Sequence, residues 1–301
     1  IVLHHFMVKV REEHYLQTLE YHSILIKARG LSIMESHYQI ETVMRNKFAL
    51  RMLHVKLPMD FVDKINSYID NTLIPSDKNF GKVKGNAELS NSYSNLLVGQ
   101  IRQDEKSAQL DCKVLEENED AKLLKSTLDS TSQEYLRQIG HGNSVPDVFE
   151  AWSVHSYSGD YNPLHDHGVI TPGGLSMILY LKVPECISKL PDPDEDWVSL
   201  NHSTGNVDGM TYFIWEQRNQ DMLRKLYPIS EEYFKPKVGS LLIFPNWLKH
   251  AVMPFYGEGE RRTLAANANI ISPNMVDWKN SSEEDRQKIL ETFRRHNIPK
   301  E

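Results

Sequence analysis

A series of short apolar segments, separated by clusters of Gly, Pro, Asn and Asp, runs through the second half of this 301-residue chain. Such segments, rich in β-branched and aromatic residues, are typical of β-strands. The predicted strands are 149–157, 174–183, 196–200, 210–215, 238–244 and 262–271. Antiparallel strands can bring distant residues together in a jelly roll. We therefore predict an α+β protein with a mainly β core, a double-stranded β-helix of the jelly-roll or cupin-like type.

Helical patterns flank this core. Apolar residues at helical spacing predict helices over 58–71 and 114–139, the second with Asn118 as its cap and Gly140 as its stop. We expect four regions: 1–56, an N-terminal helical extension; 57–147, a supporting region of helices and loops; 148–272, the double-stranded β-helix core; and 273–301, a C-terminal helix. The extension either packs on the core or offers a partner interface.

Three further segments carry weaker patterns. Residues 75–94 are rich in Gly, Asn and Ser and form either a lid or a surface loop. Residues 96–101 are apolar enough for a short strand, and residues 216–233 have the pattern of an insertion with a short helix. We expect the loop and the insertion to shape access to any site on the core.

His165, Asp166 and His167 stand together in one short stretch. Along an extended strand successive side chains point to opposite faces, so His165 and His167 share a face and Asp166 points away. Two imidazoles on one face can converge on one metal ion, and non-haem iron centres commonly use two histidines and a carboxylate. A surface turn with two solvated histidines is the alternative. If the backbone is a bulge or a turn, Asp166 can exchange roles with His167.

A third histidine and an arginine follow near the last two predicted strands. His250 comes just past the end of strand 238–244, where a ligand is well placed. Arg261 and Thr263 are two residues apart and share a face of the next strand, whereas Arg262 faces the other way. A guanidinium with a hydroxyl beside it is suited to binding a carboxylate. Taken alone, Arg261 fits equally a surface salt bridge on a hairpin.

Together these residues resemble the Fe(II)- and 2-oxoglutarate-dependent oxygenases, and more narrowly the 2OG-Fe(II) oxygenases of bacteria and marine phages. The resemblance lies in four motifs in the same order, over about residues 95–272. The counterparts in this chain are Trp152 through Gly159 with Tyr161, Asn162, His165 and His167; Leu175 through Tyr180; Phe244 through His250; and Gly259, Glu260 and Arg261. Four ordered motifs make the resemblance specific.

The resemblance implies an oxidoreductase that binds Fe(II) through three histidines, His165, His167 and His250. Asp166 is the alternative to His167, because most of the wider superfamily has a carboxylate as the second ligand. Arg261 would pair with the far carboxylate of the co-substrate 2-oxoglutarate, and Thr263 would support it. The second co-substrate is O₂, and the implied reaction is a hydroxylation that releases succinate and CO₂. Three neutral imidazoles would leave the iron more positive and strengthen its hold on an anionic co-substrate.

Two aromatic residues are further candidates for lining the cofactor site. Tyr180 lies on the strand after the histidine pair, where its phenol could reach a carboxylate, and Trp152 lies on the strand before it. A core role is an equal alternative for both, because large aromatic side chains dominate any core.

Composition excludes several other classes of protein. The net charge of −7 argues against a nucleic-acid groove, which relies on clustered Lys and Arg. No run of about eighteen apolar residues occurs, so no transmembrane helix is expected, and no signal peptide is visible. The two cysteines exclude a disulfide scaffold and suit a reducing compartment. We expect a cytoplasmic enzyme with a small-molecule or peptide substrate; the oligomeric state stays open.

Two other functions fit the same residues. A three-histidine dioxygenase of the cupin type would bind its substrate directly on iron and would not use 2-oxoglutarate. A non-catalytic jelly-roll binding module would retain the fold alone. Arg261 separates the first alternative from the main hypothesis, because a cupin-type enzyme gives this side chain no task.

Overall fold

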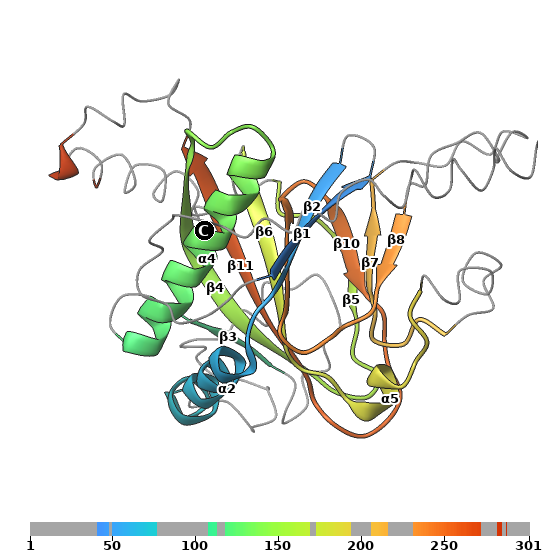
Figure 1. Ribbon diagram of the computed structural model, residues 1–301. Coiled ribbons are helices and arrows are strands. Elements are labelled where there is room, and N and C mark those ends of the chain that lie inside the picture. The colour runs from blue at the N-terminus through green and yellow to red at the C-terminus, as the bar shows by residue number, and fades with distance from the viewer. Residues whose placement is uncertain are drawn as a thin grey trace, which may run out of the picture.

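Two antiparallel β-sheets face each other in the computed structural model, which describes residues 41–47, 50–76, 108–112, 118–168, 173–193, 206–215, 231–271, 282–284 and 287 (Figure 1). The larger sheet has the spatial order β1 (Glu41–Lys47), β2 (Leu50–Lys56), β9 (Ser240–Pro245), β6 (Gly174–Lys182), β11 (Arg261–Ile271), β4 (Val145–Ser156) and β3 (Ala108–Asp111). The smaller sheet has the order β5 (Asn162–His165), β10 (Lys249–Val252), β7 (Thr211–Ile214) and β8 (Glu231–Phe234).

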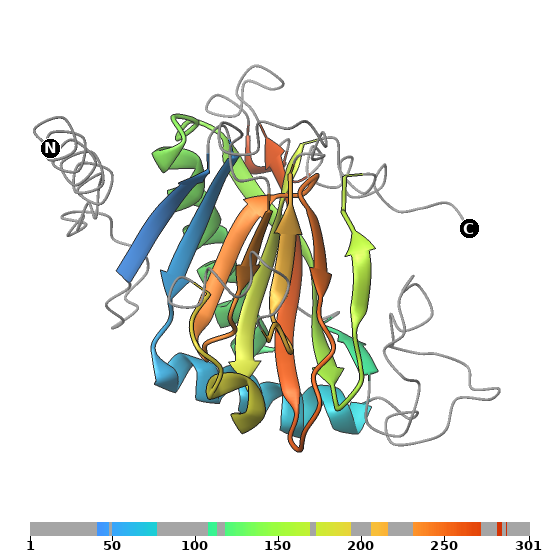
Figure 2. The same ribbon diagram turned by 90° about the vertical axis from the view of Figure 1, so that its right-hand side faces the viewer.

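From β4 to β7 and again from β8 to β11, successive strands alternate between the larger and the smaller sheet. This alternation places segments far apart in the sequence side by side, as when β11 pairs with both β4 and β6. The arrangement is the predicted double-stranded β-helix. Figure 2 views it from the side of the smaller sheet.

The helices labelled α2 and α4 in Figure 1 cover the outer face of the larger sheet, on the side away from the smaller sheet. The described helical segments are α2 (Met59–Tyr68), a π-helical turn (Ile69–Leu73), α3 (Ile74–Ser76), α4 (Glu119–Gln138) and α5 (Glu185–Ser188). In α4 the side chain of Asn118 accepts hydrogen bonds from the backbone N–H groups of Asp120 and Ala121, which caps the helix as expected. Gly140 follows with φ of 86°, the left-handed conformation that ends many helices.

Strand alternation divides the interior into two layers. On β6, Met177 and Leu179 face the helices, whereas Ile178 and Tyr180 face the smaller sheet. The layer between the two sheets contains Leu50, Met52, Ile178, Tyr180, Phe213, Phe234, Leu242, Phe244 and Leu248. A polar side chain on the inner face of the larger sheet is therefore unusual in this apolar layer, because each buried polar group needs a hydrogen-bond partner there.

The helical expectation for the N-terminal extension is wrong for residues 41–47 and 50–56. These residues form β1 and β2, and β2 pairs with β9, which makes them part of the larger sheet. Apolar residues in 50–57 fit a helical spacing as well as a strand, and only the partner strand decides between them. The short strands β3, β5, β8 and β10 were not predicted either. His250 lies within β10 instead of just past β9.

Several predicted elements lie outside the described residues. They are the whole segment 1–40, the strands 96–101 and 196–200, most of the loop 75–94, most of the insertion 216–233 and most of the C-terminal helix. Residues 231–233, placed in the insertion, belong to β8. Among the described helices, none combines the length and apolarity that a membrane crossing requires.

Candidate metal centre and co-substrate site

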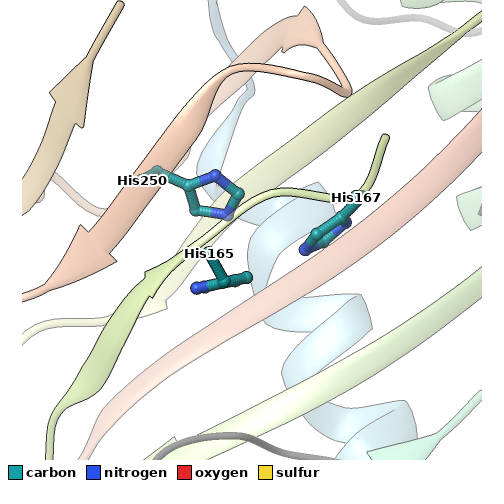
Figure 3. Close-up of side chains that lie close together, drawn as sticks. All are labelled: His165, His167 and His250. Atoms are coloured by element: carbon teal, nitrogen blue, oxygen red, sulfur yellow. The ribbon is translucent and has the colours of Figure 1, made fainter. Parts of the chain in front are cut away.

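Three histidines converge between the two sheets (Figure 3). One ring nitrogen of each of His165, His167 and His250 lies within 4.8 Å of the others. The ring centroids are 4.3 Å apart for His165 and His250, 5.2 Å for His167 and His250, and 5.3 Å for His165 and His167. The structure thus gathers residues from two segments that are far apart in the sequence.

Strand pairing positions two of the rings, and one backbone hydrogen bond positions the third. His165 on β5 and His250 on β10 are direct partners across the antiparallel pair, so their side chains share a face. His167 follows the end of β5, but its backbone N–H donates to the carbonyl of Asn246 at 2.8 Å. That bond keeps the segment beside the β9–β10 turn, and His167 faces the same space as His165.

Each imidazole uses its Nδ1 atom to reach an oxygen. The partner is the Pro163 carbonyl for His165 at 2.7 Å, the Leu248 carbonyl for His250 at 3.0 Å, and the Asn267 side-chain oxygen for His167 at 2.8 Å. Carbonyl and amide oxygens can only accept hydrogen bonds, so in each neutral ring the proton sits on Nδ1. The three Nε2 lone pairs are left to face one another.

Burial keeps these rings neutral. Removal from water lowers the pKa of His165, His167 and His250, and for His250 the positive charge of the other two rings lowers the pKa further. Neutral imidazoles with their lone pairs directed at a common point are the donor set that iron, zinc, copper and nickel accept. The described residues therefore fit a transition-metal ion.

Asp166 points away from the histidines. Its carboxylate pairs with Lys249 Nζ at 2.7 Å and accepts a hydrogen bond from the backbone N–H of Gly168 at 3.1 Å. The hydrogen bond from Lys249 lowers the pKa of Asp166. Of the two predicted alternatives, the structure brings His167 and not Asp166 to the cluster.

Arg261 is buried at the start of β11, on the face that looks toward the smaller sheet. Its Nε donates to the Gly209 carbonyl at 3.0 Å, and its Nη2 donates to Thr211 Oγ1 at 3.3 Å. Within the described residues, no carboxylate lies close enough to form an ion pair with this guanidinium. Burial lowers the pKa of Arg261. A buried cation with neutral partners alone fits an anion supplied by a ligand.

Arg262 points to the opposite face, as strand alternation predicts. Its guanidinium donates to Asp70 at 2.6 Å and to Glu260 at 2.7 Å. The two consecutive arginines therefore differ in their partners: Arg262 has carboxylates, and Arg261 has none among the described residues.

The other predicted site residues divide between the surroundings of Arg261 and those of the histidines. Tyr180 lies under Arg261, whose guanidinium carbon is 5.5 Å from the ring centroid, and its hydroxyl is 2.6 Å from Thr211 Oγ1. Burial raises the pKa of Tyr180 to about 12, so its hydroxyl keeps its proton. Thr263 is buried opposite Tyr180. Trp152 lies instead beside the histidines, with its ring 5.9 Å from that of His167.

Sequence reasoning missed four polar residues of the site. Thr211 contacts both Arg261 and Tyr180. Asn267 forms hydrogen bonds with His167, Glu150 and Ser176. One signal was present: Arg261, Thr263 and Asn267 are polar residues that alternation places on a single face of a mainly apolar strand.

Comparison with known proteins agrees with the residues gathered here. Residues 150–267 match the sequence model of the family described as "Putative 2OG-Fe(II) oxygenase". No curated protein matches the chain. The matched range contains the three histidines, Arg261 and the inner faces of β4, β6 and β11.

Solved structures similar to this chain include other oxygenases at low identity. A Pseudomonas putida prolyl-4-hydroxylase is 12% identical, with 77% of this chain and 92% of that chain covered and a TM-score of 0.41. A viral collagen prolyl hydroxylase from Paramecium Bursaria Chlorella virus-1, in its 2OG complex, is 15% identical, covering 72% and 95%, with a TM-score of 0.38. HygX from Streptomyces hygroscopicus, with nickel and 2-oxoglutarate bound, is 11% identical, covering 72% and 82%, with a TM-score of 0.42.

These TM-scores are too low to assign a substrate. The family match stands apart from them, because it covers the segment that builds the site. The segment 150–267, which carries the site residues, is thus similar in sequence to the 2OG-Fe(II) oxygenases, a family of oxidoreductases that use Fe(II), 2-oxoglutarate and O₂.

Proposed function

We propose that the protein is a hydroxylase in which His165, His167 and His250 hold Fe(II) and Arg261 holds the distal carboxylate of 2-oxoglutarate. One observation supports this assignment above the others. Three Nε2 lone pairs face one another in the same interior layer in which a buried guanidinium lacks a carboxylate partner among the described residues. A metal ion satisfies the first group, and a dianionic co-substrate satisfies the second.

The protein's own groups would bind and orient the reactants. When bound, iron and 2-oxoglutarate supply the oxidising chemistry: 2-oxoglutarate loses CO₂ and becomes succinate, and one atom of O₂ enters the substrate as a hydroxyl group. The histidines donate no negative charge to the metal. An Fe(II) ion held by three neutral ligands keeps its full positive charge, which favours an anionic co-substrate over a neutral one.

Hydroxyl groups beside Arg261 would complete the carboxylate subsite. Thr211 Oγ1 accepts from Arg261 and shares one hydrogen bond with the Tyr180 hydroxyl. Two hydroxyl protons are present and one is used in that shared bond, so one remains to donate to a ligand oxygen. Thr263 lies opposite Tyr180 on the same sheet. We assign Arg261, Tyr180, Thr211 and Thr263 to the co-substrate and Trp152 to the wall beside the metal.

The substrate is proposed to be a small molecule or a peptide. Trp247, three residues before His250, is 52% exposed, and an apolar part of the substrate would cover it. Leu164 is also exposed, but it directly precedes His165 on β5, so its side chain faces away from the metal position.

Anaerobic titration tests the proposal directly. Fe(II) and 2-oxoglutarate added together should give a weak visible metal-to-ligand charge-transfer band, and aerobic incubation should release succinate. His165→Ala or His250→Ala should abolish metal binding. Arg261→Gln should weaken 2-oxoglutarate binding by about 2–4 kcal/mol, the loss typical of removing a buried charged hydrogen-bond partner, and should leave metal binding intact. Absence of the band with both ligands present would refute the proposal.

The three-histidine donor set also fits a dioxygenase that does not use 2-oxoglutarate. In such an enzyme Fe(II) would still bind, but 2-oxoglutarate would produce neither the band nor succinate. The anion-free surroundings of Arg261 among the described residues favour the first function.

A further inference from the structure

We infer that Asn267 and Glu150 are positioning residues that set the proton and the orientation of His167, and so the strength with which this ligand holds the metal. The inference rests on the proposed function, because it concerns the metal site formed by the three histidines. It assigns a task to two polar side chains that neither the co-substrate nor the substrate requires.

The contacts form one continuous chain. Asn267 is fully buried, its Nδ2 donates to Glu150 Oε1 at 2.5 Å, and its Oδ1 accepts from His167 Nδ1 at 2.8 Å. The Ser176 hydroxyl donates to the same Oδ1 at 2.9 Å. An ionised carboxylate can only accept hydrogen bonds, so Glu150 fixes which end of the Asn267 amide faces it. The amide oxygen must then face His167.

This orientation determines the tautomer of His167. With the amide oxygen opposite Nδ1, the imidazole proton sits on Nδ1 and the Nε2 lone pair faces the metal position. If the amide were reversed, its NH₂ group would meet Nδ1, the proton would move to Nε2, and the ligand atom would be blocked. Glu150 prevents that reversal without touching the histidine.

His167 differs in this respect from the other two histidines. His165 and His250 are each oriented by a backbone carbonyl two residues earlier, Pro163 or Leu248. A backbone carbonyl two residues earlier is present whatever the side chains are. The orientation of His167 depends instead on side chains, with Asn267 Oδ1 at 2.8 Å and the Ser176 hydroxyl at 3.3 Å from Nδ1, which makes it the ligand whose properties this sequence can tune.

We call the hydrogen-bonded series Glu150–Asn267–His167 the relay, and strand register brings its members together. Asn267 on β11 is directly opposite Glu150 on β4 and directly opposite Ser176 on β6, so the three side chains lie on one face. A register shift in the β11–β4 pairing follows immediately after Asn267. Such bulges commonly redirect a side chain beside a functional site.

The relay also places a negative charge near the metal without using it as a ligand. Asp166 is paired with Lys249, whereas Glu150 reaches His167 through a single amide. A carboxylate behind a ligating imidazole raises the basicity of the ring. Burial raises the pKa of Glu150, and the hydrogen bond from Asn267 partly offsets this effect.

The affinity of the 301-residue chain for metal tests the inference, with Co(II) as a spectroscopic probe under anaerobic conditions. Asn267→Ala should weaken Co(II) binding by roughly 10- to 100-fold, the usual cost of losing such a partner, and should alter the visible absorption of bound Co(II). Asn269→Ala is the matched control. It removes another buried amide of β11, one that lies opposite Asp147 on β4 and Gly174 on β6 instead of Glu150 and Ser176, and it should leave affinity unchanged even where it lowers stability.

A paired exchange separates positioning from a merely structural role. Asn267→Asp alone places two carboxylates against each other and should weaken Co(II) binding. Adding Glu150→Gln restores one donor opposite one acceptor, because the glutamine amide donates to the introduced aspartate while that carboxylate accepts from His167. The double variant should recover wild-type affinity. Glu150→Gln alone keeps the side-chain shape, should fold, and should weaken binding severalfold through loss of charge.

The outcomes distinguish the inference from the function on which it rests. No Co(II) or Fe(II) binding by the wild-type protein would refute the proposed function. Metal binding by the wild type with unchanged affinity and spectrum in both Asn267→Ala and Glu150→Gln would overturn the relay alone. Failure of the double variant to recover affinity, while it folds as stably as the wild type, would also overturn it.

Discussion

At the scale of residues, the site depends on where protons sit. Each histidine donates a hydrogen bond from Nδ1 to an oxygen that can only accept hydrogen bonds. The lone pair of Nε2 is therefore available to bind a metal ion. Arg261 and Arg262 are neighbours in the sequence, yet one has only neutral partners among the described residues and the other has two carboxylates. One step along a strand is enough to change the chemistry of a side chain, because it changes the face.

A comparison of two adjacent substitutions tests the assignment of the second ligand. His167→Ala should abolish metal binding. Asp166→Ala should retain it within a few-fold, because Asp166 pairs with Lys249 at the surface and such pairs contribute about 1 kcal/mol or less. Metal binding can be followed by Co(II) absorption in both variants. Loss of metal in Asp166→Ala alone would show that the backbone turns at this position in the metal-bound protein.

At the scale of elements, β11 organises the site. Arg261, Thr263 and Asn267 project from one face of this strand toward the smaller sheet, while Leu264, Ala266 and Ala268 pack on the helix side. Arg261 donates hydrogen bonds to the Gly209 carbonyl, in the turn before β7, and to Thr211, the first residue of β7. The position of the Arg261 guanidinium therefore depends on how this turn meets β11.

Gly209 is the sensitive point of that turn. Its φ is 66°, and a Cβ there would lie 2.2 Å from Ile187 Cδ1. Gly209→Ala should cost roughly 2–5 kcal/mol of unfolding free energy, the sum of about 1–2 for the left-handed backbone and about 1–3 for overpacking. We also expect weaker 2-oxoglutarate binding, because the acceptor of Arg261 Nε would move. Urea unfolding and the charge-transfer titration would measure the two effects.

Gly140→Ala serves as the control for this substitution. Gly140 has φ of 86° but no atom within 4 Å of an added Cβ, so only the backbone cost of about 1–2 kcal/mol is expected. Gly140 follows α4 on the outer face of the larger sheet, away from the layer that contains the histidines and Arg261, so the substitution probes stability alone. Equal losses of stability in the two variants would contradict the predicted clash with Ile187.

At the scale of the whole molecule, a charged network ties the helix layer to the larger sheet beside the site. Arg262 on β11 donates to Asn66 of α2 at 3.1 Å and to Asp70 at 2.6 Å, and it also holds Glu260. Glu260 accepts from His155 Nδ1 at 2.7 Å. Burial lowers the pKa of His155, so this ring stays neutral and donates its one proton to Glu260. The network anchors the backbone from which Arg261 projects.

This network predicts a loss of stability in acid. Burial alone would raise the pKa of Glu260, but hydrogen bonds from His155 and Arg262 and the charge of Arg262 lower it to about 2, from 4.5. Since the folded-state pKa is depressed, the carboxylate stabilises the fold fully above pH 4.5, and the contribution is lost as the pH falls from 4.5 toward 2. The difference corresponds to about 3 kcal/mol at about 1.4 kcal/mol per pKa unit.

Urea unfolding between about pH 7 and about pH 3 would measure this dependence. Glu260→Gln should be less stable at neutral pH and should have a flatter dependence of unfolding free energy on pH. Glu258→Gln, in the same turn but exposed, should follow the wild-type curve. A wild-type slope that persists in Glu260→Gln would assign the acid sensitivity to other carboxylates.

Local chemistry was enough to predict a large part of this molecule. Apolar segments bounded by clusters of Gly, Pro, Asn and Asp predicted the long strands β4, β6 and β11, and cap chemistry predicted both ends of α4. Alternation also predicted that His165 and His167 share a face and that Arg262 faces away from Arg261. These features depend on residues within a few positions of one another, so the sequence carries them directly.

Only the tertiary structure decided which distant residues meet. Four-residue strands such as β5, β8 and β10 are too short for a periodic pattern, and β1 and β2 become strands because β9 offers β2 a partner. The contacts of Thr211 with Arg261, and of Glu150 and Asn267 with His167, arise from strand register between segments far apart in the chain. The sequence by itself determined which side chains share a face of a strand. The packing of the sheets decided which partner each side chain contacts, because the partner depends on strand register and not on neighbours in the chain.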